Sequence, residues 1–247
     1  MTPAHARPGR ARGLIWKLEW QRAMARRRLL AFNIVIPLAL VLPLALSAAP
    51  AHHAAAVQTV LFTLFGTFGA TIPALRDAER GLVRRLAILP VGARDLLLER
   101  AFAGASLDLL QLLPAVAVVT WSAGAGSGQA LRLVAALACT LAFVNLLGLW
   151  LAAAVRSVAE GALVAAVAAL FVLHASGVFR TPTPGSIGAR IEAVAPFRAL
   201  HEMLLALHDS GDPGGGAALV GSLALMVVLT VSAAGPVVRA LRRADGR

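Results

Sequence analysis

Six long apolar segments alternate with shorter polar segments along this 247-residue chain. The apolar runs lie near residues 29–49, 54–75, 101–121, 130–154, 158–179 and 217–238. Each run has about the 20 residues that a helix needs to cross the ~30 Å hydrocarbon core of a bilayer. The pattern predicts an all-α, polytopic membrane protein with six transmembrane helices. Residues 1–28 then form a cytoplasmic leader, and residues 29–247 form the membrane domain.

The basic residues between the runs predict how the helices are oriented. Nineteen of the 23 Lys and Arg residues lie in the leader, in residues 76–100, at position 156 and after residue 238. The other four are Arg132, Arg180, Arg190 and Arg198. Because cytoplasmic connections hold the excess of Lys and Arg, both ends are predicted to lie inside, in a bacterial-type inner membrane. Topology and acidic lipid headgroups thereby explain the net charge of +11 without a nucleic-acid partner.

The leader has the pattern of a helix that lies at the membrane surface. Trp16, Trp20 and Met24 recur every four residues and form an apolar stripe, with arginines beside it that can reach lipid phosphates. One alternative is a basic leader that only enforces orientation. A cleaved signal peptide is disfavoured, because the first apolar run is long enough to span and five more follow.

The connection between the second and third runs carries another amphipathic pattern. Leu82, Leu86 and Leu89 share one face of a short predicted helix, and Pro90 ends it. This apolar ridge would lie on the cytoplasmic side. It is suited either to the lipid headgroups or to a groove on a soluble partner.

The order of residues in this connection resembles a known family, the ATP-binding-cassette (ABC) permeases of the type-2 exporter class. Glu79, Gly81, Leu82, Leu86 and Pro90 match the family's loop between its second and third spans, although the usual Thr after the Gly is missing. In that family the loop forms a coupling helix that is seated on a separate ATPase subunit. The resemblance implies the following ATPase-coupling residues: Glu79, Arg80, Gly81, Leu82, Leu86, Leu89 and Pro90.

A second similarity follows the fifth run. Residues 191–204 resemble the family's segment that re-enters from the outer face before the last span, although Ala195 replaces the Asn that usually precedes the proline. Together the two similarities imply the membrane permease of an ABC exporter. Its implied partners are two copies of a separate ABC ATPase, a second permease copy or a paired permease, and membrane lipids.

Two further patterns bear on assembly. The only lysine, Lys17, lacks the glycines of a phosphate-binding P-loop, so ATP hydrolysis is expected on the other subunit and no cofactor is predicted. Gly161, Ala165 and Ala169 form a ridge of small residues that allows close contact between helices.

Polar residues inside the apolar runs are candidates for the transport pathway, because polar groups in hydrocarbon are costly. These residues are Asn33, Asp108, Gln111 and Asn145. Asp108 and Gln111 share a helical face, and the expected partner of Asp108 is an arginine from a neighbouring helix or water in a cavity. Alternatively, Asp108 lies near the headgroups and turns towards Arg100. Asn33 and Asn145 either line a pore or bond neighbouring helices.

Two other functions remain open at this point. One is an intramembrane enzyme or lipid-modifying protein that uses Asp108 and the histidines near the outer side. The other is a permease-like subunit that assembles a complex without conducting a substrate. His201-Glu202 begins like a metalloprotease motif, but Leu205 replaces the second His, and His208 adds no third ligand. No metal site or catalytic group is predicted.

Overall fold

The computed structural model describes residues 14–47, 49–79, 93–155, 157–180, 183, 185–195, 197–209, 224 and 228. Within these ranges the chain forms helices and no strands, which confirms the all-α prediction. Five helices within these described ranges are long and apolar enough to cross a membrane. They are α2 (Arg27–Leu46), α3 (Ala51–Glu79), α5 (Ala93–Ser122), α6 (Ser127–Ala154) and α7 (Val158–Ala175). Apart from positions 224 and 228, the predicted sixth span lies outside the described residues.

The helices differ in length from the apolar runs that predicted them. α3 and α5 extend past their runs at the ends that face the 80–92 connection, so polar turns continue beyond the apolar length. α7 is shorter and ends at Ala175, where the fifth run was predicted to continue to residue 179. Gly177 has a φ of +74°, and a Cβ there would lie 2.6 Å from the carboxylate of Glu192. The chain therefore turns at a position that only glycine can occupy without strain.

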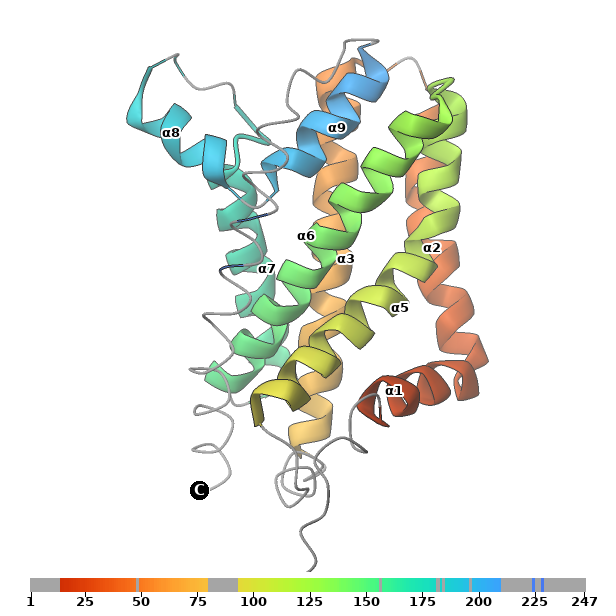
Figure 1. The fold of residues 1–247 in the computed structure, drawn as a ribbon, viewed down its shortest axis with the longest axis vertical. Coiled ribbons are helices and arrows are strands. Elements are labelled where there is room, and N and C mark those ends of the chain that lie inside the picture. The colour runs from red at the N-terminus through yellow and green to blue at the C-terminus, as the bar shows by residue number, and fades with distance from the viewer. Residues whose placement is uncertain are drawn as a thin grey trace, which may run out of the picture.

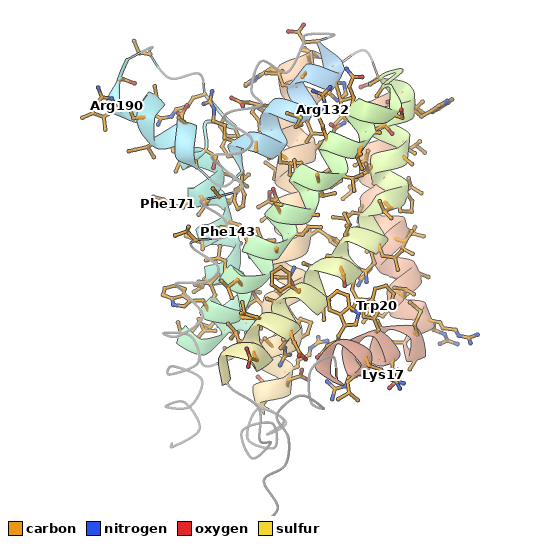
Figure 2. All side chains as sticks on the ribbon, viewed as in Figure 1. Lys17, Trp20, Arg132, Phe143, Phe171 and Arg190 are labelled. Atoms are coloured by element: carbon orange, nitrogen blue, oxygen red, sulfur yellow. The ribbon has the colours of Figure 1, made fainter. Side chains whose placement is uncertain are left out.

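Short helices lie at the two ends of the bundle (Figure 1). α1 (Leu14–Ala25) lies across one end, whereas α8 (Ile187–Val194) and α9 (Arg198–His208) lie at the opposite end. Figure 2 shows Trp20 of α1 directed towards the bundle and Lys17 directed away from it. Trp20 Nε1 donates a hydrogen bond to Ser106 Oγ of α5 at 3.2 Å. The predicted surface stripe is therefore divided, because Trp20 packs on α5 while Trp16 and Met24 are exposed.

α3 lies at the centre of the packing, against α6, α7 and α9. Its buried face carries a threonine every fourth residue: Thr59, Thr63, Thr67 and Thr71. Thr67 and Thr71 each donate to the carbonyl one turn earlier, so their hydroxyls are satisfied inside the helix. The small-residue ridge of α7 is buried, and its Gly161 lies against Leu75 of α3. In this chain the ridge therefore serves a contact between two of its own helices.

Candidate functional site: a polar cavity at the α1 end

A cavity of about 680 Å³ lies between α2, α3 and α5, with α1 across one end and α6 behind it. All four predicted pathway residues line this cavity. Asn33 comes from α2, Asp108 and Gln111 from α5, and Asn145 from α6. Three helices thus bring together polar side chains that are far apart in the sequence. Their role in transport stays a prediction.

Asp108 is held by an amide and has no cationic partner among the described residues. Only 6% of the residue is exposed, and its Oδ2 accepts a hydrogen bond of 2.8 Å from Asn145 Nδ2. The same nitrogen donates to the Leu141 carbonyl at 3.0 Å. Arg100, the alternative partner considered for Asp108, instead pairs with Asp77 at 2.5 Å. No arginine within the described ranges pairs with Asp108, and Asn145 both joins two helices and lines the cavity.

Gln111 lies one helical turn beyond Asp108 on the same face of α5. Only 5% of the residue is exposed, and its Oε1 has no hydrogen-bond partner in the described part of the chain. A buried amide oxygen without a donor is unfavourable unless another group approaches it. Gln111 and Asp108 thus provide two acceptors that the protein itself leaves partly or wholly unsatisfied.

Glycines make room for the hydrogen-bonded side chains of Asp108 and Asn145. A Cβ at Gly69 of α3 would lie 2.8 Å from Asp108 Oδ1, and a Cβ at Gly104 of α5 would overlap Asn145 Oδ1. Gly66, one turn before Gly69, lies against Leu141 and Val144 of α6. The sequence prediction missed these positions. Their signal is a pair of glycines three residues apart in the second apolar run, opposite the run that contains Asp108.

The α1 end of the cavity is strongly charged and joins three helices. Asp77 of α3 bonds Arg100 of α5, and Arg22 of α1 lies 3.9 Å from Asp77 and 3.6 Å from Glu19. The rim of the cavity is completed by Arg26 and Arg76, which are both exposed. Sequence reasoning connected these arginines with topology and lipid phosphates, and Arg100 with Asp108, but did not predict the contact between Asp77 and Arg100.

Apart from these polar and charged groups, the cavity wall is mostly apolar. The apolar lining includes Leu29, Leu30, Phe65, Phe68, Ile72, Leu107 and Leu149. A volume of this size, with apolar walls and a few convergent polar groups, is typical of sites that bind small organic molecules. The arrangement is suited to holding a molecule with an apolar body and one polar end.

Residues 12–206 match the family model described as "ABC-2 type transporter". The chain belongs to the ABC-2 type transporter family. It is thus an integral membrane protein and the permease component of an ABC transporter. This component is not itself catalytic. Permease domains of this family normally pair with an ABC ATPase subunit. The match includes every residue that lines the cavity. A search of curated proteins gives no match to this ABC-2 chain.

Of the residues predicted to couple the ABC-2 permease to its ATPase, the structure describes only Glu79. Glu79 is the exposed last residue of α3. The other coupling residues, Arg80, Gly81, Leu82, Leu86, Leu89 and Pro90, lie outside the described residues. The coupling prediction accordingly rests on the sequence and on the family.

At the opposite end of the ABC-2 permease, α9 packs on α3 through two histidines. His201 is buried, and its Nδ1 lies 3.3 Å from Thr59 Oγ1. His208 Nε2 lies 3.0 Å from Gln58 Oε1. Burial lowers the pKa of His201 to about 4, with smaller contributions in the same direction from His52 and Arg198, while the Ala55 carbonyl acts in the opposite direction. His201 is therefore neutral near pH 7.

A buried carboxylate holds the segment between α7 and α9 in place. Glu192 of α8 is fully buried and lies 3.4 Å from Arg180 Nε and 3.3 Å from Arg198 Nη1. Arg198 also bonds Glu202 at 2.6 Å. No group of three or more potential metal ligands occurs in the described ranges of the ABC-2 chain. With 11 residues, α9 is too short to span a bilayer, and its re-entry into the membrane stays a prediction.

Proposed function

We propose that this ABC-2 permease exports a substrate through the cavity at its α1 end, driven by a separate ATPase subunit that binds the 76–92 connection. The observation that carries the proposal is the convergence of Asn33, Asp108, Gln111 and Asn145 on one cavity. Polar groups inside membrane helices commonly mark substrate pathways. The cavity favours a conducting permease over a subunit that only assembles a complex. Family membership favours transport over an intramembrane enzyme.

The α1 end is proposed to face the cytoplasm. Four arginines line the cavity at this end, namely Arg22, Arg26, Arg76 and Arg100, in agreement with the excess of basic residues on the cytoplasmic side. α3 ends and α5 begins at the same end of the bundle as α1 (Figure 1), and Asp77 of α3 and Arg100 of α5 line the cavity there. An ATPase bound to this connection has direct mechanical access to two helices of the cavity wall.

The proposed coupling mechanism follows from the contacts between these helices. ATP-driven closure of two ATPase copies moves the connection and with it the adjacent ends of α3 and α5. The bond of 2.5 Å between Asp77 and Arg100 makes the two ends move together. The hydrogen bond between Trp20 and Ser106 carries α1 with α5. The cavity between the helices then changes shape, opens outward and releases its substrate, with a second permease copy forming the other half of the pathway.

A co-purification experiment tests the coupling. An ABC ATPase subunit that partners this chain should co-purify with it from solubilised membranes, and Leu86→Asp should abolish both this binding and transport. Ile187→Asp is the matched control, since it makes the same kind of change at a residue of α8 that is 76% exposed at the opposite end of the bundle. Full ATPase binding and transport by the Leu86→Asp protein would reject the proposed connection.

A further inference from the structure

We propose that the cavity binds an apolar organic cation that carries N–H groups, such as a protonated amine with a hydrophobic body. This inference rests on the proposed function, because it names the class of substrate that the permease transports. Among the described residues, the cavity holds a buried carboxyl group without an ion-pair partner and other unsatisfied acceptors, and its walls are mostly apolar. Each of these features selects one property of the ligand.

The first property is positive charge. Asp108 is buried, lines the cavity and accepts a hydrogen bond from the neutral amide of Asn145. No described Lys, Arg or His forms an ion pair with it. Buried charges in proteins are usually paired, and carboxylates inside membrane helices usually face a partner or a pathway. A cationic group in the cavity would supply the missing partner.

The second property is the presence of hydrogen-bond donors. Gln111 Oε1 has no donor in the described part of the chain. Pro73 of α3 and Pro37 of α2 have no N–H, so the carbonyls of Gly69 and Asn33, four residues earlier, lack their usual helical donor. Both Gly69 and Asn33 line the same cavity as Asp108 and Gln111. N–H groups of a cationic ligand match this set of acceptors.

The third property is an apolar body. Phe65, Phe68 and Leu107 line the same cavity as the acceptors. Burial of a hydrocarbon body against these side chains is favourable, and an aromatic face also attracts a nearby cation. The volume of about 680 Å³ is sufficient for a small organic molecule.

The arginines at the rim do not reverse this preference. Arg22 and Arg100 already contact the carboxylates of Glu19 and Asp77. Arg26 and Arg76 are exposed, at the end where topology requires basic residues whatever the substrate. Arg100 lies eight positions before Asp108 on α5, about 12 Å along the helix, and its guanidinium pairs with Asp77 instead. Topology thus explains the rim but does not explain Asp108.

Binding of four matched fluorescent probes tests the inference. The full chain is reconstituted in phosphatidylcholine nanodiscs, and empty nanodiscs give the background from lipid partitioning. The probes share one dansyl-alkyl body and end in a primary amine, its N-acetylated amide, a trimethylammonium group or a carboxylate. We expect the amine to bind about tenfold more tightly than the neutral amide, since a hydrogen bond to a charged group has about that value.

Two variants assign the preference to the site. Asp108→Asn should bring the ratio of amine to amide affinity close to one, whereas Asp95→Asn, the same change at an exposed residue of α5, should leave the ratio unchanged. Gln111→Leu should weaken binding of the amine and leave the trimethylammonium probe, which has no N–H, unaffected. If Asp108→Asn does not give a monodisperse protein on gel filtration, the comparison with Gln111→Leu decides.

The outcomes separate this inference from the proposed function. Equal binding of amine and amide, tighter binding of the carboxylate, no binding above background, or an unchanged ratio in Asp108→Asn would each overturn the cationic substrate. If the ATPase co-purifies with the unmodified chain but not with the Leu86→Asp variant, the proposed permease function stands even though the cationic substrate is rejected. Conversely, a clear amine preference without ATPase binding would support the site and reject the coupling.

Discussion

Close packing of α3 and α6 holds Asn145 beside Asp108, so an added methyl group at this contact should destabilise the bundle. A Cβ at Gly148 of α6 would lie 2.7 Å from Ala70 Cβ, 2.8 Å from Thr71 Oγ1 and 3.1 Å from the Thr67 carbonyl oxygen. Carbon atoms in contact prefer about 3.5–4.0 Å, so the helices must separate by about 1 Å. Overpacking of this kind costs about 1–3 kcal/mol of stability.

Gly148→Ala is best compared with Gly128→Ala on the same helix. A Cβ at Gly128 would meet no atom within 4 Å, so this control makes the same change on α6 without the clash. The melting temperature of Gly148→Ala, followed by tryptophan fluorescence in detergent, should lie below that of Gly128→Ala. At about 2–4 °C per kcal/mol, the expected difference is about 2–12 °C. If Gly148→Ala melts at or above the control, the inferred close approach of α3 and α6 is incorrect.

Two further predictions concern the ends of the bundle. The pKa of His201 is about 4 in the folded protein, against an ordinary value of 6.5. Between these two pH values the unfolded chain therefore binds more protons than the folded protein does. Stability should fall as the pH is lowered from 6.5 towards 4, by about 3 kcal/mol at most. Melting temperatures across this range should show the loss, and His201→Gln should flatten it; an equally steep fall in that variant would show that other groups cause it. At the α1 end, Asp77→Asn leaves the side chain of Arg100, 13% exposed, without its carboxylate, and should lower stability by about 1–3 kcal/mol. The same melting assay checks this, with exposed Asp95→Asn as the control, and equal melting of the two variants would mean that the pair contributes little.

The apolar runs determined the transmembrane elements because hydropathy is a local property of the chain. The first five runs coincide with α2, α3, α5, α6 and α7, and the all-helical fold follows from the need to satisfy backbone hydrogen bonds inside hydrocarbon. The sequence also identified Asn33, Asp108, Gln111 and Asn145 as polar residues within those runs. The spans and the list of pathway candidates therefore required no tertiary information.

The tertiary structure alone decided which of these residues meet. In a soluble helix an apolar stripe marks the buried face, but lipid is as apolar as the protein interior, so these runs do not indicate which face packs on which neighbour. Asp108 and Asn145 are 37 residues apart and meet because Gly69 and Gly104 leave room for their side chains. The pair of Asp77 and Arg100 likewise depends on tertiary structure, because the two side chains meet only where the right turns of α3 and α5 lie side by side. The cavity is a consequence of this packing, and its chemistry follows from the polar side chains that the helices turn towards it.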